Sequence, residues 1–406
     1  MKSYSLTPCL SAISLAILML AGCGGGGTSA TNAKAQGIKT VQFPKTYAAG
    51  RIAGFGSIVI NGVHYDETNA TVTDEDGVAH PTSDLKLGMV AEVQAIDFGT
   101  VDNSGNSATN QTVATATAIV IKSLMLGAVT AVDPVAGTLT VLGQTVSVLR
   151  STTFDLSLPG GLATIKIGDA VKIYGLPPTA TTGYVATRIE PAANPGVYAL
   201  RGLITTYDPV AMTLTIGNAK FDVSAASFQD TPAVGALVRL IVKPLQVNGV
   251  WVAVAEKSGA DQPQDNDHTE LEGSITAFTS STSFSVDGVL VDATKVTLPS
   301  NVQLALGSRV QVAGAVVKGV LVATSVTVES DQSIDSQDLE VEGEVTAIDT
   351  TKSTLTVHGA TISFTSAVPV DGGALADIKV GSMLEVHGAL AADGTTVTAA
   401  SIRIDN

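Results

Sequence analysis

Short runs of alternating threonine and apolar residues cover most of the chain. In the clearest copy, residues 127–132 and 138–141 alternate in this way, with Asp133-Pro134 and Gly137 between them. Alternation with a period of two gives a strand one buried and one exposed face, and Asp-Pro followed by Gly marks a turn. A second tight turn at residues 142–144 leads into another alternating run. The segment therefore predicts a three-stranded meander.

The meander recurs at a nearly fixed spacing. Copies start at Gly127, Gly202, Gly273 and Gly343, and a diverged copy starts at Gly50. Each copy continues with an apolar-x-apolar-Gly segment or a shortened form of it, and a further pair of strands follows. We expect this second glycine to adopt a positive φ where the chain bends into the next strand. The glycines concerned are Gly88, Gly168, Gly235, Gly307 and Gly381.

Five strands grouped as a meander, a connector and a hairpin are typical of a small, partly open barrel of OB type. We therefore predict an all-β chain: a tandem array of five OB-like barrels of five to six strands each, packed on their neighbours. The alternatives are an open β-sandwich and a continuous β-solenoid, although solenoid coils are much shorter than this period. The expected repeats are residues 49–122, 123–192, 197–258, 269–329 and 338–406.

The first residues have the pattern of a secretory leader. Lys2 precedes an apolar stretch that is too short to span a membrane, which predicts a signal peptide over residues 1–22. Leu20-Ala21-Gly22-Cys23 resembles the lipobox of bacterial lipoproteins. This resemblance implies that Cys23 is lipidated and, because no Asp follows it, that the anchor lies in the outer membrane of the cell envelope. Residues 23–48 are then a flexible linker behind the lipid.

Charge and cysteine content narrow the possible partners. The net charge is −15, so the surface repels phosphate backbones, and nucleic acid is not expected as a partner. The chain has two cysteines. Because Cys9 leaves with the signal peptide and Cys23 carries the lipid, no thiol remains for a disulfide, a metal site or a nucleophile.

Two segments of the first repeat resemble a known family. Residues 50–65 read GRIAGFGSIVINGVHY, and residues 84–89 read DLKLGM. This combination is similar to the bacterial lipoprotein family filed as domain of unknown function 5666, and the later repeats look like diverged copies of the same module. The resemblance implies a cell-envelope protein built from β-repeats, and it carries over no catalytic residues.

Motifs for catalysis and metal binding are absent from the sequence. It has no Gly-x-Ser-x-Gly, no His-Glu-x-x-His and no phosphate-binding loop. His358 and His387 share the last repeat with Glu385, but the preceding repeat has Asp287 and Ala313 in the places of the histidines. We therefore interpret the two histidines as surface residues beside turns. We expect the protein to have no enzymatic activity and to bind no cofactor and no metal.

Acidic residues gather before the last two repeats and in one turn. Residues 261–272 and 329–344 are rich in Asp and Glu but lack the spacing of a calcium loop, so we interpret both as solvated linkers. The alternative is that calcium bridges them. Residues 74–77, Asp-Glu-Asp-Gly, predict a hairpin turn.

A small aromatic set is the remaining candidate for binding. Tyr184 and Trp251 occupy equivalent places in their repeats, Tyr174 lies across the hairpin from Tyr184, and Tyr207 follows in the next repeat. Exposed aromatic rings on an OB-like face could stack on sugars. However, Leu321 fills the same place in a later repeat, which favours a role in the core.

Taken together, these patterns predict a non-catalytic cell-envelope lipoprotein that acts as a repeat scaffold or protein-binding module. Its partners would be the membrane, through the lipid, and an envelope protein or glycan. One alternative is a carbohydrate-binding module for peptidoglycan or exopolysaccharide, and another is a hydrolase whose site has no familiar motif.

Overall fold

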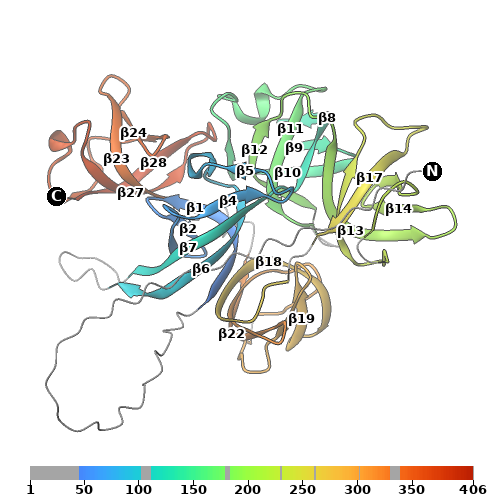
Figure 1. Ribbon diagram of the computed structural model, residues 1–406. Helices are drawn as coiled ribbons and strands as arrows, with labels where there is room; N and C mark the ends of the chain where they lie inside the picture. The colour runs from blue at the N-terminus through green and yellow to red at the C-terminus, as the bar shows by residue number, and fades with distance from the viewer. Residues whose placement is uncertain are drawn as a thin grey trace, which may run out of the picture. The chain divides into compact units, whose positions relative to one another are not determined.

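The computed structural model describes residues 45–101, 111–178, 183–228, 231–259, 262–300, 302–329 and 339–405. Strands joined by turns and three short 3-10 helices make up these parts of the chain, and they contain no α-helix (Figure 1). Among the described residues, no helix is long and apolar enough to cross a membrane. The fold class is all-β, as predicted.

The last barrel shows how each ring of strands is closed. Its strands are β23 (Leu339–Asp349), β24 (Thr354–Val357), β25 (Ala360–Ser363), β26 (Val370–Asp371), β27 (Met383–Leu390) and β28 (Thr396–Asp405). The antiparallel meander β23–β24–β25 is followed by the antiparallel hairpin β27–β28. Parallel pairing of β25 with β28 and antiparallel pairing of β23 with β27 then close the ring. This circuit confirms the predicted order of meander, connector and hairpin.

The same circuit is formed by earlier segments. One barrel contains β8 (Met125–Asp133), β9 (Thr138–Val141), β10 (Gln144–Phe154), β11 (Ala170–Leu176) and β12 (Tyr184–Pro191). The next contains β13 (Tyr198–Asp208), β14 (Thr213–Ile216), β15 (Ala219–Asp222), β16 (Leu237–Val242) and β17 (Trp251–Ser258). Another contains β18 (Asn266–Ser280), β19 (Ser283–Val286), β20 (Val289–Asp292), β21 (Arg309–Val317) and β22 (Val320–Glu329). In each, the third and fifth strands pair in parallel.

The first barrel carries an additional hairpin. Its ring is formed by β1 (Thr46–Phe55), β2 (Ile58–Ile60), β3 (Val63–Asp66), β6 (Val90–Val101) and β7 (Gln111–Lys122). Between β3 and β6 lie β4 (Thr71–Asp74) and β5 (Ala79–His80), which pair with each other, and β4 also pairs with β7. The 3-10 helices occupy the connectors and are η1 (Thr82–Asp84), η2 (Gly161–Thr164) and η3 (Leu375–Asp377).

A repeated hydrogen-bond pair fixes the connector to the first strand of each barrel. In the β18–β22 barrel, Gly307 N–H donates to the Ile275 carbonyl, and Ile275 N–H donates to the Ser308 carbonyl. Ile275 lies at a bulge in β18, where the strand register shifts. Gly307 has φ = 94°, and the other four glycines named above also have positive φ. The prediction about these glycines is therefore confirmed, because this backbone conformation is costly for other residues.

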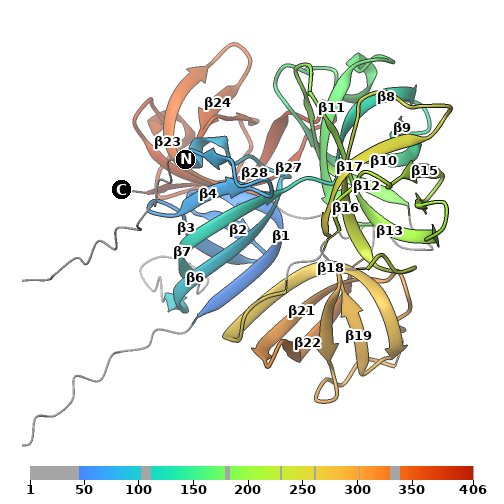
Figure 2. The ribbon, with the colours of Figure 1, turned by 45° about the vertical axis from the view of Figure 1, so that its right-hand side comes forward.

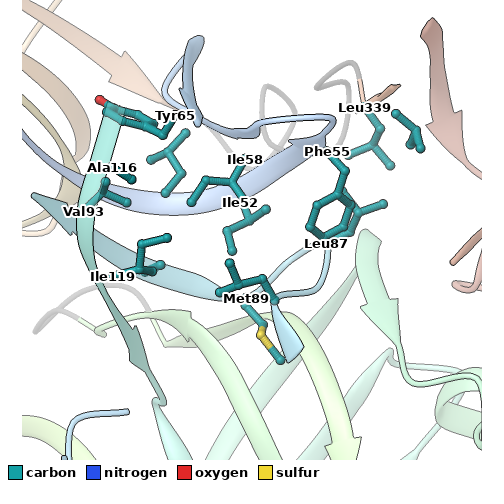
Figure 3. Close-up of a cluster of buried hydrophobic side chains, with 14 of the residues drawn as sticks. Ile52, Phe55, Ile58, Tyr65, Leu87, Met89, Val93, Ala116, Ile119 and Leu339 are labelled. Atoms are coloured by element: carbon teal, nitrogen blue, oxygen red, sulfur yellow. The ribbon is translucent and has the colours of Figure 1, made fainter. Parts of the chain in front are cut away.

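Each ring encloses buried aliphatic side chains, and some cores extend across barrel boundaries. In the first barrel, Ile52, Ile58 and Ile119 have no exposed surface (Figure 3). Leu339, from β23 of the last barrel, belongs to the same buried cluster. The β8–β12 and β13–β17 barrels likewise share one cluster, whereas the β18–β22 barrel has a cluster of its own.

Strand pairing also joins barrels that are far apart in the sequence. β1 pairs in parallel with β18 through Thr46–Ala49, and with β23 through Gly54 and Phe55. β8 pairs with β13 in the antiparallel sense. We expected repeats to pack on their sequence neighbours. The β8–β13 pairing agrees with this expectation for two consecutive repeats, whereas the first barrel makes main-chain contacts with the two last ones. Figure 2 shows β1 and the strands of its own ring from a second side.

Some expected boundaries differ from the structure. β1 begins at Thr46, inside the segment expected to be a linker, and β18 begins at Asn266, three residues before the expected repeat. The signal peptide and Cys23 lie outside the described residues, as do Asp261, Asp331, Asp335 and Asp338. The solvated-linker interpretation is wrong for Glu272, because it lies in β18 and its carboxylate is buried and accepts a hydrogen bond from Arg51 N–H.

Candidate functional site

The aromatic candidates are mostly buried, Tyr184 and Trp251 within their own rings and Tyr174 against the first barrel. Tyr174, Tyr184 and Trp251 are buried, and Tyr207 is partly buried. Tyr184 donates from its hydroxyl to the Arg201 carbonyl at 3.2 Å. Burial raises the pKa of Tyr184. Because three of the four rings have no exposed face, these positions do not offer the platform that stacking on a sugar requires.

The place of Tyr184 and Trp251 in the fold explains their burial. Each stands at the start of the fifth strand, where that strand pairs in parallel with the third: Tyr184 with Val146, and Trp251 with Phe221. Leu321 has the same position opposite Val291. The equivalence predicted from the sequence is therefore present, and the shared role is to fill the barrel where the ring closes.

The turn between β4 and β5 joins the first barrel to the β13–β17 barrel. Glu75 contacts Arg201, and its Oε1 lies 2.9 Å from Arg239 Nε. Asp76 accepts two hydrogen bonds from Arg239, at 2.8 and 2.9 Å, and one from Lys257 at 2.8 Å. The two arginines are buried and directly opposite each other on β13 and β16. We call these five residues the ion-pair joint.

Electrostatics favour the charged form of both acids in the joint. Burial alone would raise the pKa of Glu75, but the charges of Arg201 and Arg239 outweigh it and lower this pKa. Burial would also raise the pKa of Asp76, but its hydrogen bonds from Arg239 and Lys257 lower that pKa to about 2. Such a network is stable only while every charge keeps its partner.

A polar cavity of about 610 Å³ lies beside the ion-pair joint. Its walls include Lys45, Glu92 and Lys122 in addition to residues of the joint. Lys122 Nζ lies 3.1 Å from Glu92 Oε1, so these two charges also pair with each other. Glu92, Lys122 and the charged residues of the joint are therefore engaged in ion pairs that hold the fold, and we interpret the cavity as a gap between barrels and not as a reaction centre.

A second polar group lies near the contact of β1 with β23. Glu340 on β23, and Glu385 and His387 on β27, have ligand atoms within 4.8 Å of one another. His387 Nε2 lies 2.8 Å from Glu385 Oε1, and His64 Nε2 of the first barrel lies 3.6 Å from Glu340 Oε2. The hydrogen bond with His387 lowers the pKa of Glu385, while burial lowers the pKa of His64. We call these four residues the His–Glu cluster.

The two histidines of the last repeat are not brought together. His358 is exposed and stacks on Phe55, with ring centroids 4.8 Å apart, as expected for a surface histidine beside a turn. His387 is partly buried and faces Glu385, as their two-residue spacing on one strand implies. Sequence reasoning missed Glu340 and His64. Glu340 reaches the site through the β23–β27 ladder of its own barrel, and His64 reaches it from the first barrel, and no local pattern records either contact.

Asp287 is the residue equivalent to His358 in the β18–β22 barrel. It occupies the turn between β19 and β20 with φ = 47°, as His358 does in the last barrel. Its carboxylate accepts a hydrogen bond from Ser274 N–H at 3.0 Å. Burial raises the pKa of Asp287 to about 7, since this partly buried carboxyl group has little water around it.

The ion-pair joint could have been predicted in part from its two arginines. Arg201 and Arg239 fall in the first and fourth strands of one repeat, which pair in an OB-like ring. Two arginines side by side in a barrel wall need carboxylate partners, and the acidic turn at residues 74–77 was available. We predicted this segment only as a hairpin turn, which the structure confirms for Asp74–Ala79.

Comparison with known proteins identifies the repeated module. The family model described as Domain of unknown function (DUF5666) matches residues 127–190, 272–327 and 342–403. These segments include most of the β8–β12, β18–β22 and β23–β28 barrels, so three of the five expected repeats are matched and the number of copies remains a prediction. No curated protein matches the chain. On the strength of these three segments, the chain contains three modules that match the DUF5666 family.

Proposed function

We propose that the protein is a non-catalytic cell-envelope lipoprotein whose barrels form a scaffold for binding other proteins. The observation that carries this proposal is the double pairing of β1, which is hydrogen-bonded to the first strands of two other barrels. The ion-pair joint connects the same barrel to a third. Main-chain pairing and buried charges both resist sliding, so this arrangement supports a body that holds its surfaces in fixed positions.

A recurring exposed residue supports protein binding. The residue before the connector glycine is apolar and largely exposed in three barrels: Ile167 at 71%, Val234 at 66% and Val380 at 61%. In the first barrel the equivalent Leu87 is only 9% exposed. There the side chains of Thr153 and Arg188 donate hydrogen bonds to the Leu87 carbonyl from a neighbouring barrel. The residue before the connector glycine can therefore form a contact between barrels. In the other barrels the same residue is exposed and available to a partner protein.

Cross-linking in intact cells tests this proposal. We expect the protein to form cross-links with one or more envelope proteins, and the triple variant Ile167→Asp, Val234→Asp, Val380→Asp to lose them. Val135→Asp is the matched control, because Val135 is an exposed apolar residue in a turn outside this position. Absence of protein cross-links in the parent, or unchanged cross-links in the triple variant, would contradict the proposal.

Cell fractionation tests the anchor separately. The variant Cys23→Ser cannot accept a lipid on sulfur, so we expect it to move from the membrane fraction to the soluble fraction of the envelope. A protein that stays with the membranes after this change would not be held there by lipidation of Cys23.

A further inference from the structure

The His–Glu cluster has the side chains of a metal site. We propose that Glu340, Glu385 and His387, completed by His64, bind one divalent transition-metal ion of the zinc class. Imidazole nitrogen and carboxylate oxygen are common zinc ligands, and four of them suit its tetrahedral geometry. This inference stands on the cluster alone and does not depend on the scaffold proposal.

Strand pairing places three of the ligands. In the β23–β27 ladder, Glu340 lies opposite His387, and Glu342 lies opposite Glu385. Glu385 and His387 are two residues apart, so their side chains leave β27 on the same face. Ligand atoms around one tetrahedral zinc lie about 3.4 Å apart, given bonds of about 2.0–2.1 Å. The three groups lie within 4.8 Å, so rotation of the partly exposed His387 would bring them into range.

The surroundings orient the ligands as metal sites require. His64 Nδ1 lies 3.2 Å from Ser57 Oγ. When Nδ1–H donates to this hydroxyl, Nε2 presents its lone pair towards Glu340. Arg403 on β28 contacts Glu385 Oε2, which leaves Oε1 on the side of His387. Hydrogen bonds of this kind to the outer atoms of ligands fix their orientation around a metal.

The charge of the cluster also favours a cation. Glu340, Glu342 and Glu385 place three carboxylates on two adjacent strands, and Arg403 pairs with the buried Glu385. A divalent ion placed among these carboxylates is attracted by their negative charge. Because His64 comes from the first barrel, the ion would also connect two barrels where β1 pairs with β23.

Metal titration of the full mature chain tests the proposal. After treatment with a chelator, Zn²⁺ is added and binding is measured by equilibrium dialysis, with Co²⁺ absorption as a report on geometry. We expect one ion per chain and the visible bands of tetrahedral Co²⁺. His387→Ala and Glu340→Gln should each weaken binding by more than about tenfold, and Ser57→Ala, which removes only the outer hydrogen bond, by about tenfold.

His80→Ala is the matched control, because His80 also faces two carboxylates, those of Asp74 and Asp84, but lies outside the cluster. This variant should bind as the parent does. Circular dichroism of each variant separates loss of the site from loss of the fold. Binding of less than one ion per chain, or undiminished binding by folded His387→Ala and Glu340→Gln, would overturn the proposal.

Discussion

At the scale of the residue, backbone conformation explains which positions recur. The connector glycine has positive φ, and its N–H donates a hydrogen bond to the bulged first strand. The backbone conformation therefore explains why glycine recurs here, and no ligand is needed to explain it. Turn residues behave in the same way: Asp133 and Asp208 each accept hydrogen bonds from two backbone N–H groups within their own turn. The repeated residues are therefore those that the barrel itself requires.

Gly235 allows the conformational cost to be measured alone. A Cβ at this position would meet nothing within 4 Å, but φ is +86°. Gly235→Ala should therefore destabilise the β13–β17 barrel by about 1 kcal/mol through the backbone only. Trp251, the single tryptophan of the chain, reports this barrel in denaturation followed by fluorescence. The control is Gly196→Ala, which has open space and no positive φ and should leave the midpoint unchanged.

Asp287 predicts an unusual dependence of stability on pH. Its folded pKa of about 7 lies above the ordinary aspartate pKa of 3.8. The folded state therefore binds more protons between these values, and this residue's contribution to stability falls as pH rises from about 4 to 7. Asp287→Asn keeps the turn and removes the charge, so it should stabilise the protein by up to roughly 4 kcal/mol at pH 8 and by little at pH 4. Calorimetry at both pH values checks this, and an equal effect at both would contradict it.

At the scale of the element, the hairpin β4–β5 shows how an addition to one repeat changes its contacts. The other rings described here lack this hairpin between their third and fourth strands. Its turn provides Glu75 and Asp76 to arginines of another barrel. In the first barrel, an element that the other rings lack therefore adds a contact between barrels to those made by the first strands.

Removal of one charge from the ion-pair joint should strongly reduce the stability of the protein. Glu75→Ala leaves Arg201 and Arg239 buried without this carboxylate, and we expect a loss of about 3 kcal/mol in the stability of the β13–β17 barrel. Lys257→Ala is the control, because Lys257 is exposed and its pairing with Asp76 should contribute less than about 1 kcal/mol. Denaturation followed by Trp251 fluorescence distinguishes them, and similar effects of the two changes would contradict a buried joint.

The strands of each ring could be predicted from the sequence because alternation and turns are local patterns. The positive φ of Gly88 and Gly381 followed from the same reasoning. The pairing of β1 with β18 and β23 could not be predicted, since any exposed strand edge can accept a partner and periodicity does not say which. The His–Glu cluster and the ion-pair joint depend on such long-range contacts, so their members were seen separately as a turn, a linker or surface histidines.

At the scale of the whole molecule, the central question is whether the barrels move together. Their cores meet in two shared clusters, and β1 joins sheets from different ends of the chain. An array in which each repeat contacts only its sequence neighbours would contain the cluster shared by the β8–β12 and β13–β17 barrels, but not the pairing of β1 with β18 and β23. The proposed scaffold depends on these contacts of β1, because they would hold its binding surfaces at fixed distances from one another.

Distance measurement between spin labels tests this claim most directly. A chain expressed from residue 23 with Cys23→Ser has no other cysteine, so labels can be placed at Val210→Cys and Val380→Cys, two exposed sites in the β13–β17 barrel and the last barrel. Because β1 pairs with β23 of the last barrel and the ion-pair joint connects the first barrel to the β13–β17 barrel, we predict one narrow distance distribution that broadens when Glu75→Ala is added. A broad distribution in the parent, unchanged by Glu75→Ala, would show that the barrels move independently and would contradict the scaffold.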